Sequence, residues 1–425
     1  MMPARAETWI VVRPVIVVAV LSASLFAGAL PASAQVKLTF DKHPAIDFGN
    51  AFTASVRVKS QNDWRDFPSE AGSDQKNVFD PYRERIAVEG TIAGRVLYHV
   101  EREFHDTSSP WKNVYLETRV LHGVHLQGGQ FNMPFGLDQT TSLMNQDFNY
   151  HSLAGAFLAP GRGLGVMAYG DFFKKNLLAY EAGVFRQDGD NTRSAQLQDV
   201  HVAPTFAGRI VVKPFSKWQP LYFVRSMETG FAFTDGELPA GLYNLKGQTT
   251  PGDGFVQKAY VNGRRQRLGA ELQWRPGPVG VQAEAIRVRD TRFGQGIEDE
   301  DLPNLVERAW YVSGTWLVTG EHKKDTITPA RPFLNGGYGA VEFGARLERL
   351  STGNGPALNP AVYGPRSPDV FPTADLVWTT GVNWYVNKFF ELSLNVIRED
   401  RTLPRTATLS SGPVWSRTFR IEFGL

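Results

Sequence analysis

Hydrophobic and polar residues alternate along most of the chain with a period of two. Near the C-terminus, Trp415, Phe419 and Ile421 share one parity, whereas Thr418 and Arg420 have the other. Successive side chains of a β-strand point to opposite faces. The alternation therefore predicts strands that each have one apolar and one polar face.

The same pattern recurs in about sixteen segments, which predicts an all-β chain. These segments lie at about 46–59, 82–91, 93–104, 112–121, 123–131, 163–173, 176–186, 204–214, 219–233, 262–275, 279–292, 306–319, 337–350, 373–386, 389–398 and 415–425. An even number of antiparallel strands is typical of bacterial barrels that span the outer membrane.

The length of the segments bears on where the sheet lies. Most contain about ten residues, more than the five or six typical of globular sheets and enough for a tilted strand to cross a bilayer. A soluble sandwich would turn its polar face outward, whereas a membrane barrel turns it toward the lumen. The chain has no Cys, so an exported form must be held by its core or by closed strand pairing. We therefore expect a transmembrane antiparallel β-barrel.

The first 34 residues have the features of a targeting segment. Arg5 and Arg13 precede an apolar run at 15–30, and Ala32-Ser33-Ala34 fits a cleavage site for small residues. A transmembrane anchor is the alternative, but the apolar run is short and ends at Pro31. We expect a cleaved signal peptide at 1–34 and one mature barrel domain at 35–425, located in the outer membrane of a Gram-negative bacterium.

The connections between the expected strands fall into two classes. Short turns such as 276–278 and 387–388 are expected on the periplasmic side. Long polar segments are expected to form external loops, and they lie at 234–261, 293–305, 351–372 and 399–414.

One long segment, at about 132–162, interrupts the alternation after the fifth strand. It begins within GQFNMPFGL, residues 129–137, where Pro134 and Gly136 end the strand pattern. It is also rich in apolar residues that an exposed loop would not favour: Met133, Phe135, Leu143, Met144, Phe148, Leu153, Phe157 and Leu158. A barrel of about sixteen strands encloses a channel too wide for side chains to fill. We infer an inward-folded constriction loop, with an ordinary external loop as the alternative.

Several motifs occur in order and resemble the phosphate-selective porin O and P family. They are NVYLETRVLHGVHLQGGQFNMPFGLDQTTS at 113–142, AFLAPGRGLGVMAYGDF at 156–172 and RERIAVEGTIAG at 83–94. The resemblance covers roughly 80–190. It implies a sixteen-stranded trimeric outer-membrane porin whose third loop enters the lumen. It also implies anion selectivity through arginines and lysines along the passage.

The chain departs from the family pattern at two places. Family members often carry Lys directly after GQF, where this chain has Asn132. Tyr150-His151-Ser152 stands where the family tends to have an acidic-basic-Ser motif, and no Lys lies between Lys112 and Lys174. Phosphate selectivity and general anion passage therefore both remain open.

The strand period predicts which charged residues face the lumen. For the anion path near the constriction we select Arg83, Arg85, Arg119 and Arg162. Guanidinium groups donate bidentately to anion oxygens, and rings of Arg or Lys form anion-selective pores. The alternative for each is a structural ion pair with a carboxylate of a neighbouring strand. Asp138 and Asp147 would oppose anions, and we expect wall arginines to neutralise them.

Other chemistries find little support in the sequence. His122 and His125 are three apart and would lie on opposite faces of a strand, so we predict no metal site. The glycine-rich run at 161–165 precedes a strand instead of opening a helix, which argues against a nucleotide site. No Ser-His-Asp arrangement stands out. We expect no enzyme activity, no cofactor and no nucleic-acid partner.

The sequence thus predicts passive, anion-preferring diffusion of small solutes such as phosphate or polyphosphate. The expected partners are small anionic solutes, outer-membrane lipid and two further copies in a homotrimer. The alternatives are a general or carboxylate porin, a non-conducting barrel with an adhesive or structural role, and a membrane-embedded hydrolase.

Overall fold

The computed structural model describes residues 36–40, 43–67, 77–106, 109–172, 177–189, 203–216, 222–243, 247–353, 364–403 and 412–425. The expected signal peptide at 1–34 and the first residue of the expected mature domain lie outside these ranges.

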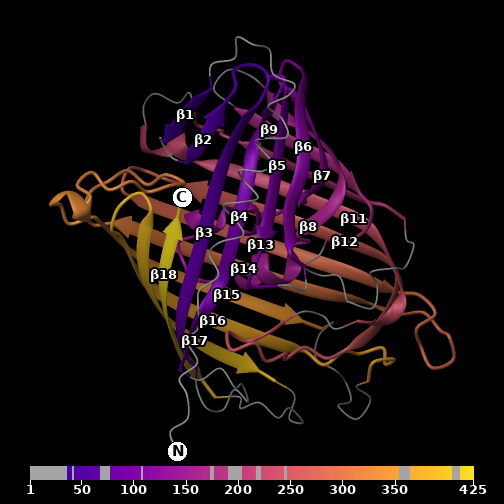
Figure 1. Ribbon diagram of the computed structural model, residues 1–425. Helices are drawn as coiled ribbons and strands as arrows, with labels where there is room; N and C mark the ends of the chain where they lie inside the picture. Colours follow the sequence, from indigo (N-terminus) through magenta and orange to yellow (C-terminus); the bar gives the residue numbers. More distant parts are fainter. Residues whose placement is uncertain are drawn as a thin grey trace, which may run out of the picture.

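Sixteen strands in the described ranges form a closed antiparallel barrel (Figure 1). They are β3 (Thr53–Asp66), β4 (Val78–Ile92), β5 (Val96–Glu103), β6 (Trp111–Leu121), β7 (Val124–Asn132), β8 (Arg162–Phe172), β9 (Leu178–Phe185), β10 (Thr205–Val212), β11 (Glu228–Tyr243), β12 (Ala259–Trp274), β13 (Val279–Arg292), β14 (Leu302–Leu317), β15 (Ala340–Thr352), β16 (Thr373–Tyr385), β17 (Phe390–Thr402) and β18 (Val414–Gly424). Each pairs with the next, and β18 pairs with β3 to close the ring. The predicted barrel of about sixteen strands is confirmed.

The polar faces of the strands point inward and the apolar faces point outward. In β15, Glu342, Arg346 and Glu348 are buried, whereas Phe343 between them is exposed. Exposed Phe231, in β11, follows the same rule. An outer surface of this kind suits lipid, because a soluble sandwich would bury these apolar side chains.

The N-terminal end of the barrel differs from the expectation. The segment predicted as one strand at 46–59 is divided, because Gly49 adopts a φ of 67° and turns the chain. A short hairpin of β1 (Lys37–Phe40) and β2 (Pro44–Asp47) results, and β2 pairs with the start of β3. The prediction of a continuous strand was wrong at this point.

The ninth barrel strand also lies further along the chain than predicted. The strand expected at 219–233 is β11, which begins at Glu228 and is preceded by the short helix η6 (Tyr222–Ser226). Most of the strand, residues 234–243, falls in the segment predicted as an external loop at 234–261. Polar residues occupy both faces here, because this end of the strand extends past the apolar band, so the alternation is lost.

The connections differ in length between the two ends of the barrel. Short turns at 275–278 and 386–389 join strands at one end, together with an unexpectedly long connection at 318–339 that contains η7 (Phe333–Asn335). Longer connections at 293–301 and 353–372 lie at the other end. Among the described residues, no helix is both long and apolar enough to cross a membrane.

Candidate functional site

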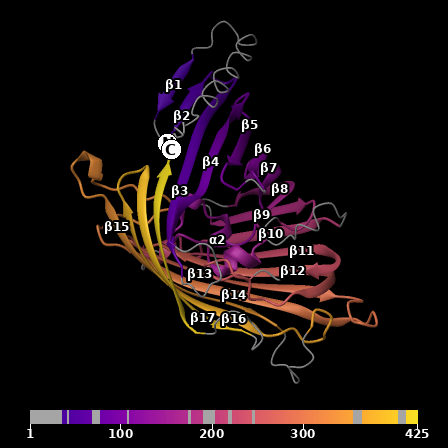
Figure 2. The same cartoon turned by 60° about the horizontal axis from the view of Figure 1, so that its bottom comes forward.

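The segment between β7 and β8 contains three short helices inside the ring of strands (Figure 2). They are α2 (Leu137–Thr140), η3 (Leu143–Asn145) and the single π-helical turn η4 (Ala154–Leu158). The base of the segment is closed where the amide of Met133 donates to the carbonyl of Gly161 at 2.9 Å. Residues 133–161 are called the inner segment below.

Hydrogen bonds connect the inner segment to the polar faces of several strands. The amides of Leu137 and Asp138 donate to the Glu284 carboxylate of β13 at 3.1 and 3.2 Å. The amide of Asn149 donates to Asn395 Oδ1 of β17 at 2.8 Å. The Asn149 side-chain amide also donates to the Thr418 hydroxyl of β18 at 2.9 Å. β13 is separated from the adjacent pair β17 and β18 by three strands, so the segment is held at two places around the ring.

Apolar packing accounts for the hydrophobic character of the inner segment. Phe135, Ala154 and Leu158 are fully buried in one cluster with wall residues such as Ile286 and Tyr311. The contact is close, since a Cβ added to Gly269 would lie 3.1 Å from the ring of Phe135. This side of the barrel interior is therefore filled.

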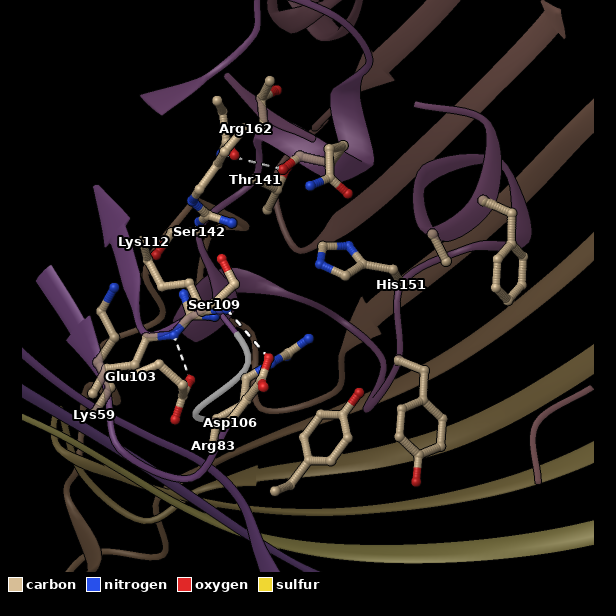
Figure 3. Close-up of a pocket in the computed structure, with 18 of the residues that line it drawn as sticks. Lys59, Arg83, Glu103, Asp106, Ser109, Lys112, Thr141, Ser142, His151 and Arg162 are labelled. Atoms are coloured by element: carbon tan, nitrogen blue, oxygen red, sulfur yellow. Dashed lines mark hydrogen bonds and ion pairs between the residues drawn. The ribbon is translucent and has the colours of Figure 1, made fainter. Parts of the chain in front are cut away.

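A polar cavity of about 890 Å³ remains between the inner segment, strands β3 to β6 and residues of β15 to β17 (Figure 3). Eight Arg or Lys side chains and five Asp or Glu side chains of the described residues line it. The basic ones are Arg57, Lys59, Arg65, Arg83, Arg85, Lys112, Arg162 and Arg346. With histidines neutral, basic groups outnumber acidic groups along this cavity.

Most of the basic groups are held by carboxylates of neighbouring strands. Arg85 contacts Glu103 at 2.8 Å and Glu101 at 3.2 Å, and Glu101 also lies 3.3 Å from Lys59. Arg57 lies 3.2 Å from Glu89. Such pairs fix the positions of the guanidinium and ammonium groups, and they cancel part of the positive charge.

Arg83 is held differently from the other arginines. Its guanidinium donates to Gln61 at 3.4 Å and lies 4.6 Å from the centre of the Tyr82 ring. Within the described ranges, no carboxylate lies at ion-pairing distance from it. Its charge is therefore available to a solute in the cavity.

The structure brings three of the four predicted path residues together. Arg83, Arg85 and Arg162 line the cavity, where Arg162 Nε donates to Asn113 Oδ1 at 3.0 Å. Arg119 does not line it. It is exposed near the end of β6 and contacts the adjacent His122 at 2.7 Å.

The two carboxylates of the inner segment contact groups other than wall arginines. Asp138 accepts from His151 at 3.0 Å and from the amide of Ser152 at 2.9 Å. Burial alone would raise the pKa of Asp138, but His151, Arg346 and the Ser152 amide lower it below its ordinary value. Asp147 lies 2.5 Å from Lys323 of the 318–339 connection. Arg346, a wall arginine of β15, thus acts on Asp138 without contacting it, as expected in part, whereas the group that contacts Asp147 is a lysine and not a wall arginine.

Several cavity residues were not selected from the sequence. Arg57 and Lys59 lie on the polar face of β3, and Lys112 lies at the start of β6. The alternation indicated that Arg57 and Lys59 face the lumen, because both have the parity of the polar residues in β3. Their proximity to β5 and β6 depends on the barrel's closure, which no local pattern specifies.

Comparison with known proteins identifies a family. A family model described as phosphate-selective porin O and P matches residues 55–412. No curated protein matches the chain.

Solved structures resemble the fold at low sequence identity. The outer membrane channel DcaP of Acinetobacter baumannii has a TM-score of 0.55 at 9% identity, covering 88% of this chain and 98% of that chain. A loop-deletion mutant of OmpT of Vibrio cholerae has a TM-score of 0.54 at 9% identity, covering 88% and 100%. OmpF of Salmonella typhi has a TM-score of 0.51 at 11% identity, covering 88% and 98%. At these identities the likeness establishes the fold alone.

Proposed function

Because the chain belongs to the phosphate-selective porin O and P family, we propose that it gives passive, anion-preferring diffusion of small solutes. Membership makes the protein an outer-membrane porin, a channel and not an enzyme. We place the path of the solutes in the cavity beside the inner segment, and we assign phosphate as a preferred solute.

The excess of basic groups along the cavity carries this proposal. Eight Arg or Lys side chains face five Asp or Glu side chains, and Arg83 lacks a carboxylate partner in the described part of the chain. Charges of one sign in a narrow passage with protein walls raise the local concentration of counter-ions. An anion entering the cavity would therefore meet a favourable potential.

The surrounding carboxylates keep binding weak enough for release. Glu101 and Glu103 hold Arg85 in place and offset part of its charge. Guanidinium groups fixed in this way offer donors for phosphate oxygens without a change in conformation. Conduction requires binding that permits both entry and exit.

The inner segment serves in this proposal as the constriction. It fills the side of the lumen next to β13 and β14, so solutes are directed along the basic side. We further assign residues 1–34 as a cleaved signal peptide, residues 35–425 as the mature domain, and a homotrimer as the assembled state.

Planar-bilayer recording of the purified protein tests this function. We expect discrete conductance steps in KCl, and we expect added phosphate to reduce the chloride current in a concentration-dependent way. Conductance without a reduction by phosphate would favour a general or carboxylate porin. The absence of conductance would favour the non-conducting adhesive or structural barrel.

A further inference from the structure

Three arginines on the outer face of the barrel form a compact group, which we call the outer arginine cluster: Arg287, Arg308 and Arg349. All three are exposed and have the parity of outward-facing residues in β13, β14 and β15. Arg287 is the direct cross-strand partner of Arg308. Arg349 pairs with Trp310 and so lies diagonal to Arg308. Side chains so related are within about 5–8 Å at their Cβ atoms.

The cluster lacks the carboxylate partners that three other outward-facing arginines have. Arg264 pairs with Asp235, Arg398 with Asp400 and Arg417 with Asp66. For the three arginines of the cluster, the described ranges contain no carboxylate at ion-pairing distance. Like charges directly opposite each other destabilise a sheet. An external anion at this position would relieve that repulsion.

The height of the cluster on the barrel points to a membrane surface. Arg287 is eight positions from the short-turn end of β13, and Arg308 and Arg349 are nine positions from the corresponding ends of β14 and β15. A tilted transmembrane strand uses about 9–11 residues. The cluster therefore lies at the interface next to the longer connections, where charged residues on the outer face cost little.

An apolar groove of about 860 Å³ begins beside two of these arginines. Arg287, Arg308 and Trp310 line one part of it. The remainder is formed by small residues between larger ones, and its outward-facing lining includes Gly208, Ile210, Phe231, Phe233, Leu268, Ala270 and Ala285. The exposed Phe231 and Leu268 would flank a chain laid over the small residues.

We propose that the outer arginine cluster and this groove form one binding site for a membrane lipid whose headgroup carries phosphate. The guanidinium groups donate to phosphate oxygens, for which their planar geometry is suited. One acyl chain of the same lipid occupies the groove. Charge complementarity selects this occupant, since an uncharged lipid would leave the repulsion among the three guanidinium groups unrelieved.

Binding of lipid A to the purified protein in detergent tests the site. Native mass spectrometry would compare synthetic diphosphoryl lipid A with its dephosphorylated form. We expect the phosphorylated form to bind at least about tenfold more tightly. The variant Arg287→Gln/Arg308→Gln/Arg349→Gln should lose that preference. The control Arg264→Gln/Arg398→Gln/Arg417→Gln removes three outward arginines that already have carboxylate partners, and it should keep the preference.

Each other outcome overturns the proposal. Equal binding of both lipids by the wild type would show that phosphate is not recognised. An equal loss of the preference for the phosphorylated lipid in the two triple variants would show that this cluster is not the binding site. Displacement of lipid A by excess inorganic phosphate would show an anion site that needs no acyl chain. Loss of oligomers in the cluster variant alone would show a contact between copies. Heat-modifiable migration on gels checks that both variants are folded.

Discussion

At the scale of single residues, the arginines of the cavity differ in how much of their charge is already compensated. Arg85 contacts two carboxylates, whereas Arg83 contacts the Gln61 amide and the Tyr82 ring. A carboxylate at ion-pairing distance cancels most of the field that a solute would feel. Arg83 should therefore contribute more to selectivity than Arg85.

The variant Arg83→Gln should lower the ratio of chloride to potassium permeability by about two- to fivefold, because it removes a fixed charge from a confined passage. The ratio follows from the zero-current potential in a KCl gradient. Arg119→Gln is the matched control, since Arg119 is exposed outside the cavity. Equal effects of the two variants would contradict the placement of the path.

Asn132 allows a test of phosphate affinity. It lines the cavity at the position where family members often carry Lys, and its Oδ1 has no hydrogen-bond partner in the described part of the protein. We expect Asn132→Lys to lower the phosphate concentration that halves the chloride current by about tenfold, because it adds a charged donor. Asn132→Gln is the control and should change it little. An unchanged value in the Lys variant would place the phosphate path elsewhere.

At the scale of elements, the 318–339 connection holds the inner segment from the short-turn end of the barrel. Lys323 is buried and contacts Asp147 and Glu342, each at 2.5 Å. Its amide also donates to the carbonyl of Gly277 at 2.7 Å. Burial lowers the pKa of Lys323, but the two carboxylates outweigh it and raise the pKa above its ordinary value. This lysine thus connects three separate elements.

We expect Lys323→Met to loosen the inner segment, since breaking a buried ion pair costs about 3–5 kcal/mol. Single-channel recording should show larger current fluctuations than in the wild type. Lys324→Met, at the exposed neighbouring position, should behave like the wild type. If the current fluctuations of both variants were as small as those of the wild type, Lys323 would not hold the inner segment.

Acid should loosen the inner segment through Asp138. Its pKa is lowered in the folded state, so its contribution to stability is present above the unfolded value of about 3.9 and is lost as the pH falls through the folded value. We expect current fluctuations to grow below about pH 4. In the Asp138→Asn variant, the current fluctuations should not change with pH. If they still grew below about pH 4 in this variant, another group would be responsible for the pH dependence.

Sequence reasoning identified the inner segment as an element but not its supports. The apolar content around Phe135 and Leu158 predicted burial, and both are fully buried. The contact of Asp147 with Lys323 could not be foreseen, because it depends on which distant connections meet inside the barrel. No period in the sequence encodes that proximity.

At the scale of the whole molecule, closure of the ring depends on the last strand. The amide of Leu425 donates to the carbonyl of Val58 at 2.8 Å, and the amide of Val58 donates to the carbonyl of Leu425 at 2.9 Å. These bonds extend the pairing of β18 with β3. Without β18, β3 and β17 would present unpaired edges, which a bilayer does not tolerate.

Deletion of residues 414–425 should therefore reduce the amount of assembled protein in the outer membrane, and Leu425→Asp should reduce it less. Heat-modifiable oligomer in outer-membrane fractions measures assembly. Levels equal to the wild type in both variants would show that this strand is dispensable.

Most of the barrel could be predicted from alternation, because one face of each strand meets water and the other meets lipid. The segment at 279–292 was predicted with the bounds of β13. The alternation is lost where that contrast disappears, as in β11 after Phe233, where Thr234 and Asp235 are both polar. Parity also selected Arg83 and Arg85, and the return of the loop to the wall selected Arg162, whereas pairing with carboxylates depends on strand register. Parity alone could not separate Arg83 from Arg85.

The zero-current potential of the wild-type protein in a planar bilayer under a KCl gradient tests the central claim most directly. Basic groups outnumber acidic groups along the cavity, so the account predicts a potential of the sign that marks chloride as the more permeant ion. A potential of the opposite sign would mean that Glu101, Glu103 and the other carboxylates dominate the passage. That result would contradict an anion-preferring porin.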